Sequence, residues 1–233
     1  MVAFHGNFAD APRRSVEAGL SVDVVLVDLG FSSNQVEAGE RGFSFQRDGP
    51  LDMRLDPTSP MTAAELIASA SEAELARILR EYGEEPAAAR IARKLVELRR
   101  STPISTTGQL ADIVRSVLGR RPGPIDPATR TFQAVRIAVN DELGSLASLL
   151  AEIERGAGRA AAGAPSWIKS GARVAVISFH SLEDRLVKQS FAGLVSRGVA
   201  AAITRKPVGA GEAEVVSNPR ARSAKLRGIR VGG

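Results

Sequence analysis

Two short runs of apolar, largely β-branched residues lie far apart in the chain, and each ends in small polar residues. The first run, Val22–Val27, leads into Asp28-Leu-Gly-Phe-Ser-Ser33, and the second, Ala172–Ser178, leads into Phe179-His-Ser181. Such runs are typical of buried strands in a parallel sheet. Ligands of open parallel sheets bind beyond the carboxyl ends of the strands. The two turns therefore predict one ligand crevice at one edge of a parallel α/β sheet.

The chain between these runs has the spacing of amphipathic helices. Apolar residues recur at helical intervals across Ser71–Arg99, Gln109–Leu118 and Thr131–Arg155. Ser71, with Glu74 three residues later, is placed as a capping box at the start of the first of these segments. The pattern predicts several helices, the last of them long and continuous.

Irregular stretches divide the chain into parts. Residues 36–62 are rich in Gly, Pro, Asp and Arg and lack periodicity, which favours a loop that is either functional or disordered. Residues 157–164 and 207–213 look like loose linkers. We therefore expect a helical insertion at 36–124 that interrupts a sheet domain. That domain would be formed by residues 1–35 and 125–233.

Composition excludes several classes of site. There is no cysteine, so thiolate catalysis, disulfides and Cys-ligated zinc are excluded. The only histidines, His5 and His180, make a multi-histidine metal centre improbable, and Asp48–Asp56 lacks the alternating ligands of a calcium loop. We expect no metal site. No apolar run approaches the roughly 20 residues that span a bilayer, and no secretory signal is evident, so we expect a cytoplasmic protein without membrane contact.

Positive charge is concentrated towards the end of the chain. The formal net charge is +5, which points to polyanionic partners. Basic residues are dense after Thr204, at Arg205, Lys206, Arg220, Arg222, Lys225, Arg227 and Arg230. Charge alone fits a solvated tail and a phosphate-contacting surface about equally well.

Two polar residues stand at the starts or ends of predicted elements. Asp28 ends the first strand, where its carboxylate faces a ligand or caps the following turn. Arg130 precedes the long helix, where helix N-terminus and guanidinium together suit a phosphate. Alternatively, Thr131 is the N-cap of that helix and Arg130 lies on the surface.

His180 lies in Ser178-Phe-His-Ser-Leu-Glu-Asp-Arg185, a stretch that resembles a hydrolase triad on composition alone. It lacks the Gly-x-Ser-x-Gly turn that a nucleophile elbow requires. Ser181 is better interpreted as the N-cap of a helix, with Asp184 in its first turn. The residues alone thus give a strand-end crevice and a basic segment, but no reaction.

Seven segments of the chain carry a more specific signal because they occur together and in one order. They are Asp28-Leu-Gly-Phe-Ser-Ser-Asn-Gln35, Arg41-Gly-Phe-Ser-Phe45, Asp48-Gly-Pro-Leu-Asp-Met-Arg54, Tyr82-Gly-Glu-Glu85, Pro127-Ala-Thr-Arg-Thr-Phe-Gln-Ala134, Ile177–Arg185 and Asn218-Pro-Arg-Ala-Arg-Ser223. Across nearly the whole chain they resemble the ribosomal RNA small-subunit methyltransferase H family, also called MraW-like.

The resemblance implies a Rossmann-like, S-adenosylmethionine-dependent methyltransferase sheet with an inserted helical domain for substrate recognition. It implies methylation of the exocyclic N4 of a decoding-site cytidine in 16S ribosomal RNA, with the small ribosomal subunit as partner. Phe8, Asp28 and Gln35 fall on its cofactor-contacting positions. Asp28 is then either the acceptor of the cytosine N–H proton or a cofactor contact only. Four residues are candidates for RNA contacts: Arg130, His180, Arg220 and Arg222.

The chain also departs from the family pattern. The family opens with a strand, a glycine-rich turn for the cofactor and an acidic residue, whereas Val2–Phe8 here match a later strand. Asp126 and Pro86 replace a usual His and Arg. We expect a gap of about 15 Å between neighbouring strands, at about 4.8 Å per strand, and an exposed apolar edge on the strand at Val22–Val27.

Weak cofactor binding by this polypeptide is the expected consequence. A start codon assigned too far downstream, or a truncated gene, would account for it. The rival hypothesis is an inactive remnant that binds RNA or the ribosome, and a third is methylation of a protein or small amine on the same fold.

Overall fold

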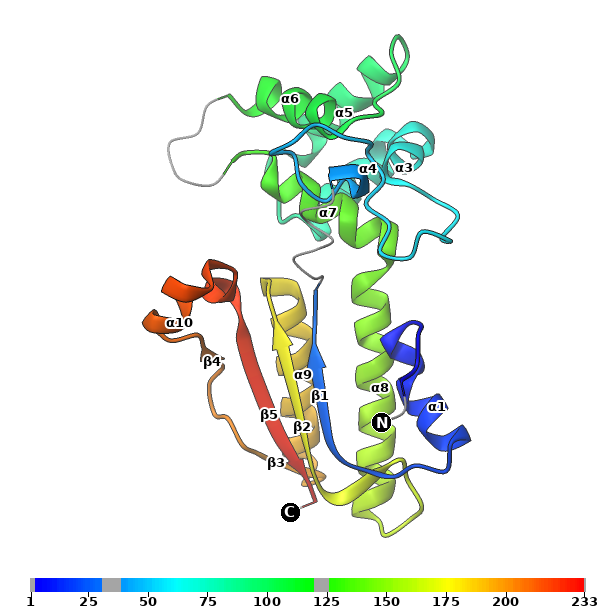
Figure 1. Cartoon of the computed structure of the whole chain (residues 1–233), viewed down its shortest axis with the longest axis vertical. Coiled ribbons are helices and arrows are strands. Elements are labelled where there is room, and N and C mark those ends of the chain that lie inside the picture. Colours follow the sequence, from blue (N-terminus) through cyan, green and yellow to red (C-terminus); the bar gives the residue numbers. More distant parts are fainter. Residues whose placement is uncertain (1–2, 31–38, 120–125, 233) are drawn as a thin grey trace. The chain divides into compact units, whose positions relative to one another are not determined.

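The chain divides into two compact units in a computed structural model that describes residues 3–30, 39–119 and 126–232. The sheet unit comprises residues 1–30 and 143–233, and the helical unit comprises residues 31–142. Figure 1 shows the strands of the first unit and the helices of the second. Among the described residues, no helix combines the length and apolar character needed to cross a bilayer.

The sheet unit is built on a mixed sheet. Its strands are β1 Val22–Asp28, β2 Ile168–Ser178, β3 Ala200–Ala202, β4 Val208–Gly209 and β5 Lys225–Val231. They lie in the order β1-β2-β5-β3, with β4 also paired to β5. β1 and β2 are parallel, which confirms both predicted strands, whereas β5 runs antiparallel to β2. The last strand therefore makes the sheet mixed and not purely parallel.

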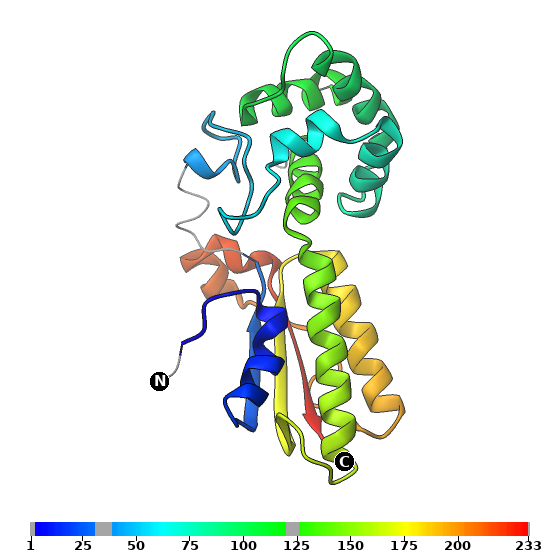
Figure 2. The same cartoon turned by 90° about the vertical axis from the view of Figure 1, so that its right-hand side faces the viewer.

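Two helices cover one face of this sheet, α8 Glu142–Ala161 and α9 Ser181–Ser196 (Figure 2). Leu146, Leu150 and Ile153 of α8 share a buried cluster with strand residues such as Val174 and Ile229. These strand residues lie opposite each other in the β2–β5 register and so point to the same face. The core of the sheet unit lies between this face and the two helices.

The opposite face of the sheet is open in the described part of the chain. Val24 and Leu26 of β1 point there and are 60% and 65% exposed. β1 is also the last strand in the sheet order on its side, so its outer edge has no strand partner among the described residues. The predicted apolar edge on this strand is confirmed.

The predicted strand near the start of the chain is wrong within the described residues. Residues 3–7 are irregular and lead into η1 Phe8–Asp10 and α1 Ala11–Glu17. The Asn7 side chain accepts the N–H of Ala9, and Pro12 stands in the first turn of α1, so local capping favours a helical start. The predicted gap between two strands therefore does not arise.

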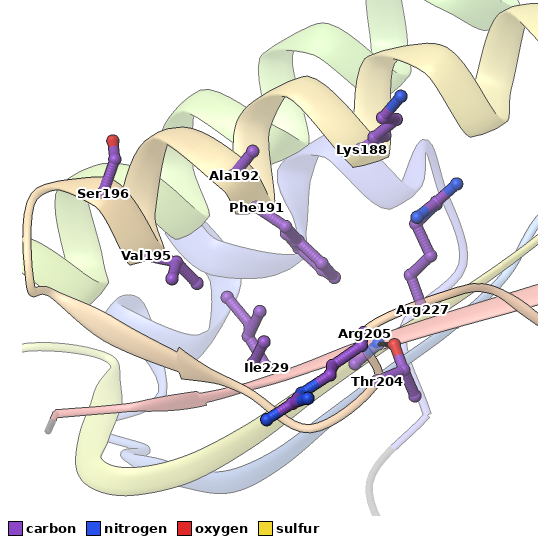
Figure 3. A pocket seen from close by; sticks show the side chains of 11 residues that line it. Lys188, Phe191, Ala192, Val195, Ser196, Thr204, Arg205, Arg227 and Ile229 are labelled. Carbon is purple, nitrogen blue, oxygen red and sulfur yellow. Dashed lines mark hydrogen bonds between the residues drawn. The ribbon is translucent and has the colours of Figure 1, made fainter.

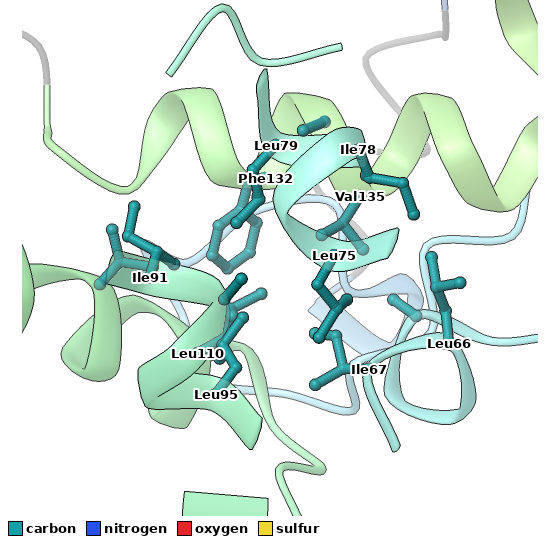
Figure 4. Packing of buried hydrophobic residues seen from close by; sticks show 14 of the residues in the cluster. Leu66, Ile67, Leu75, Ile78, Leu79, Ile91, Leu95, Leu110, Phe132 and Val135 are labelled. Atoms are coloured by element: carbon teal, nitrogen blue, oxygen red, sulfur yellow. The ribbon is translucent and has the colours of Figure 1, made fainter. Parts of the chain in front are cut away.

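The helical unit has its own core. Its helices, among the residues that the structure describes, are η2 Gly39–Arg41, α3 Ala63–Ser69, α4 Glu72–Glu81, α5 Ala88–Arg99, α6 Thr107–Leu118 and α7 Thr129–Asn140. Figure 4 shows Leu75, Ile91, Leu95 and Leu110 converging on Phe132 of α7. Because α7 contributes to this core, the compact unit reaches Glu142, beyond the expected insertion limit at residue 124.

Two helix boundaries differ from the sequence prediction. The predicted long helix is divided at Asp141, which has a left-handed backbone (φ 46°) between α7 and α8. The predicted linker at 157–164 is mostly helix, because α8 continues to Ala161. Alanine favours helix strongly, and Gly156 is required where α8 meets Trp167, since a Cβ there would lie 2.7 Å from the indole nitrogen.

Candidate functional site

The candidate site of the sheet unit lies at the carboxyl edge of β1 and β2. Asp28 is the register partner of Ile177, and the Leu29 N–H donates to the Ile177 carbonyl at 3.1 Å. The turns that follow the two strands also touch, because a Cβ on Gly30 would lie 3.4 Å from the Phe179 ring. The predicted meeting of the two strand ends is confirmed.

Asp28 presents an exposed carboxylate at this edge. Side chains alternate along a strand, so Asp28 lies on the same open face as Leu26 and Val24. Gly30 follows with φ 99°, a conformation that favours glycine. Gln35, the other residue expected near a cofactor on this turn, lies outside the described residues.

His180 caps the helix that follows β2. Its backbone is extended, and its Nδ1 accepts the Glu183 N–H at 3.4 Å, while Glu183 Oε2 accepts the N–H groups of Phe179 and His180 at 2.8 and 3.2 Å. The predicted N-cap at Ser181 is therefore wrong by one residue, because Ser181 is already helical. The sequence signal that could have located this N-cap was the His180–Glu183 spacing, which matches a capping box with histidine in place of serine.

Glu183 is a buried carboxylate, 4% exposed. Burial by itself raises its pKa, but the nearby His180 side chain and the two backbone N–H donors outweigh this and lower the pKa overall. His180 Nε2 lies 3.1 Å from Glu183 Oε1, in an arrangement not aligned for a hydrogen bond. The imidazole is only 11% exposed.

An ion pair that the sequence analysis missed joins α9 to β5. Arg227 donates to both carboxylate oxygens of Asp184, at 2.7 and 3.0 Å, and Lys225 Nζ lies 3.8 Å from the same group. The hydrogen bond from Arg227 is the main cause of the lowered pKa of Asp184. Planar guanidinium and carboxylate groups favour this two-bond geometry.

The part of the basic segment that leads into β5 lies at the same edge. Arg220 and Arg222 are exposed on η3 Pro219–Ser223, after α10 Glu212–Ser217. Two residues after η3, Lys225 opens β5 opposite Ser178, the last residue of β2. The structure therefore brings the two predicted RNA-contacting arginines to the strand edge that carries Asp28.

Phe8 is also positioned on the sheet unit. Asn7 Nδ2 donates to Ser145 Oγ at 2.9 Å, which ties the start of the chain to the first turn of α8. The end of α8 precedes the amino end of β2, so its first turn lies towards the carboxyl edge (Figure 1). The Phe8 ring next to this anchor is 40% exposed.

Arg130 belongs to the helical unit. It lies near the start of α7, is exposed, and donates from Nη1 to the Glu84 carbonyl at 3.2 Å, while Gln133 donates to the Tyr82 carbonyl at 3.0 Å. The N-cap of α7 is Ala128, and Thr131 is fully buried, so the alternative N-cap at Thr131 is wrong. Two of the sequence motifs thus pack against each other here.

The motifs of the long loop also make mainly internal contacts. Arg41 donates to the Arg54 and Leu55 carbonyls at 2.7 and 3.0 Å. Asp48 accepts the Gly108 N–H at 2.7 Å, and Asp52 forms an ion pair with Arg54 at 2.8 Å. The side chains of this loop hold it on the helical core.

Comparison with known proteins agrees with the motif pattern. The chain matches the MraW methylase family over residues 1–231. Proteins named ribosomal RNA small subunit methyltransferase H are similar to it. The protein of Syntrophotalea carbinolica is 49% identical over 244 residues, covering 97% of this chain and 74% of the relative. The protein of Synechocystis sp. is 50% identical over 226 residues (96% and 67%), and that of Myxococcus xanthus 50% over 239 residues (95% and 73%). The chain belongs to the MraW methylase family.

Proposed function

We propose that this chain is an S-adenosylmethionine-dependent methyltransferase that modifies the exocyclic N4 of a cytidine in 16S ribosomal RNA, with the small ribosomal subunit as partner. The supporting observation is the carboxyl edge of the sheet, where β1 ends at the exposed carboxylate of Asp28 and two exposed arginines, Arg220 and Arg222, lie on η3 just before β5. The names of the similar proteins support small-subunit ribosomal RNA as the substrate.

The residues at this edge fit one side of the cofactor. The Asp28 carboxylate suits polar groups of the amino-acid or ribose part, the bare Gly30 turn allows close approach, and the exposed Phe8 ring offers an apolar surface. Gln35 stays a proposed cofactor contact from the resemblance. When bound, S-adenosylmethionine supplies an electrophilic methyl group.

Asp28 has the chemistry to activate the target amine. The cytosine amino nitrogen is a poor nucleophile because its lone pair is delocalised into the ring. A carboxylate that accepts a hydrogen bond from this N–H increases the electron density on nitrogen and takes up the proton as the C–N bond forms. The target base must leave any stacked helix to reach the strand edge.

We assign phosphate contacts to Arg220 and Arg222. Both are exposed, and both lie on the segment that enters the sheet beside the strand ends. In the helical unit, Arg130 is proposed as a further RNA contact, and the insertion at 36–124 as the substrate-recognition part. His180 is proposed to act at the RNA surface chiefly by fixing the turn after β2, since its imidazole is mostly buried.

Weak cofactor binding is part of the proposal. It is supported by the unpaired outer edge of β1 among the described residues and by the exposure of Val24 and Leu26 beside Asp28. A cofactor held on one side only keeps much of its contact with water, and affinity falls accordingly. Isothermal titration with S-adenosylmethionine is expected to give a dissociation constant above the micromolar range, and micromolar binding would refute this part.

The catalytic proposal is tested by transfer of a labelled methyl group to 30S subunits at millimolar S-adenosylmethionine. Asp28→Asn is expected to lower the rate about 100-fold or more, because proton acceptance by a side chain contributes at least about that factor. The matched control is Asp23→Asn, an exposed residue at the other end of β1. Equal rates for Asp28→Asn and the unmodified chain would remove Asp28 from catalysis.

A second candidate function is an inactive module that binds RNA or the small subunit, and the open face of the sheet favours it. It predicts RNA binding with no methyl transfer at any cofactor concentration. Methylated cytidine found by mass spectrometry in subunits treated with this chain would exclude it.

A further inference from the structure

We infer that the groove between α9 and β5 binds a nucleotide of the RNA substrate away from the target base. This inference rests on the proposed function, because it names a second part of the RNA surface. The groove has a volume of about 430 Å³ and lies wholly within the sheet unit. It opens on the helix-covered side of the sheet, whereas Asp28 lies on the open face.

The shape and lining of the groove suit a nucleotide. Figure 3 shows Phe191, Val195 and Ile229 facing one another between the helix and the strand, with Lys188 and Arg227 together at one end. Arg205 and the Thr204 hydroxyl lie on the strand side. Apolar floors with a few polar groups at the rim are typical of small-ligand sites. The floor fits a ribose or base, and the cations fit its phosphate.

The charge of the groove favours a polyanion. Its lining residues include Lys188, Arg205 and Arg227 and no acidic residue. The Asp184 carboxylate lies beside the groove; Arg227 binds it directly, and Lys188 and Lys225 also lower its pKa by their charge. One carboxylate among these cations leaves an excess of positive charge, and Arg205 is exposed.

The groove is continuous with the proposed RNA surface. Arg227 lies two residues along β5 from Lys225, a distance of about 7 Å, and Lys225 pairs with Ser178 at the carboxyl edge. The basic residues therefore run from Arg205 along the start of β5 to Arg222 on η3. An RNA strand carries a phosphate at every nucleotide, so such a row of cations matches its backbone.

Equilibrium binding tests the inference. The probe is a fluorescent transcript of the small-subunit decoding region, titrated with the full chain at several salt concentrations. Arg205→Ala is expected to weaken binding about three- to ten-fold and to reduce the slope of log affinity against log salt by about 0.7, the value for one phosphate contact on a single strand. Lys188→Ala is expected to act in the same direction, and Arg205→Lys to retain most of the affinity.

Two controls separate this inference from the proposed function. Lys169→Ala removes a cation at the amino end of β2, and Arg222→Ala removes one from the proposed edge surface. Unchanged affinity and slope in Arg205→Ala and Lys188→Ala, with weaker binding in Arg222→Ala, would overturn the groove and leave the proposed function standing. Equal weakening in Lys169→Ala would also overturn it, as a nonspecific charge effect. If none of the four alanine variants changed binding, both the groove and the edge surface would be rejected.

Discussion

The helical unit and the sheet unit differ in how much of their backbone and apolar surface is left without a packing or hydrogen-bonding partner among the described residues. In the helical unit, even the long loop is held by side chains, with Asn140 accepting the Leu55 N–H and donating to the Met53 carbonyl. In the sheet unit, β1 leaves one edge and one face uncovered among the described residues. The side chains of the long loop in the helical unit thus serve to hold its fold. The exposed carboxylate proposed for chemistry, that of Asp28, lies in the sheet unit.

The largest expected effect comes from the core of the helical unit. Leu95 is fully buried there, and Leu95→Ala is expected to lower the free energy of unfolding by about 2–5 kcal/mol. Leu20→Ala in the sheet unit is the matched control, because Leu20 is 46% exposed. Urea denaturation, followed by hydrogen exchange, measures the free energy of unfolding of both variants. Similar losses for the two variants would contradict the burial of Leu95 in the core of the helical unit.

Two glycines with nearly the same backbone angle sharpen the comparison. Gly42 in the helical unit has φ 69°, and a Cβ there would lie 2.4 Å from the Pro50 carbonyl oxygen; Gly19 in the sheet unit has φ 66° and open space. Gly19→Ala carries only the left-handed backbone cost, about 1 kcal/mol. Gly42→Ala adds a backbone clash, for a total of up to about 3 kcal/mol. Thermal unfolding measures the loss of stability in both variants. A loss in Gly42→Ala that is no larger than the loss in Gly19→Ala would disprove the tight loop.

The Asp184–Arg227 pair gives the sheet unit a specific acid sensitivity. The folded pKa of Asp184 is below its ordinary value of about 3.9. Its stabilisation is therefore complete above about pH 4 and is lost as the pH falls through the lower folded pKa. Asp184→Asn is expected to reduce stability at neutral pH by about 1–2 kcal/mol and to flatten the acid limb. Asp23→Asn, at an exposed ion pair, should leave the loss of stability at acid pH unchanged. If stability fell equally steeply with acid pH in both variants, the acid sensitivity would not come from Asp184.

The smallest effect on stability is expected at the open face. Leu26→Ser replaces an exposed apolar side chain, so the free energy of unfolding should change by about 0.5 kcal/mol or less. Self-association should fall, because unpaired apolar edge strands pair with other copies. Sedimentation velocity at increasing protein concentration measures this. A loss of several kcal/mol would mean that Leu26 is packed, not open.

Local patterns predicted the elements well where one physical signal dominated. β-branched runs located β1 and β2. Ser71 accepts the Glu74 N–H at the start of α4, but the Glu74 side chain does not accept the Ser71 N–H, so only half of the predicted capping box forms. Prediction failed where long-range contacts decide. Asp141 breaks an otherwise continuous helical pattern, and Gly156 sits inside α8 because Trp167 packs on it. The antiparallel direction of β5 follows from pairing with β2, which no local spacing reveals.

The candidate site was predictable to a similar degree. The position of Asp28 at a strand end followed from the sequence, as did its nearness to the turn at Phe179 and His180. The role of His180 as a helix cap was not foreseen, because histidine is uncommon there and serine stood next to it. Arg227 looked like part of a basic tail, and only folding brings it to Asp184 across 43 positions of the chain.

The direction of the final strand determines where the molecule is best attached to a surface or fused to a reporter. β5 starts beside the strand ends near Asp28 and runs back, so that Val231 pairs with Ala200 and Gly232 lies against Ser170 at the far end of the sheet (Figure 1). The start of the chain, by contrast, is anchored to Ser145 close to Phe8. An affinity tag that follows β5 should therefore leave RNA and cofactor access untouched, because it would start from the end of the sheet opposite Asp28.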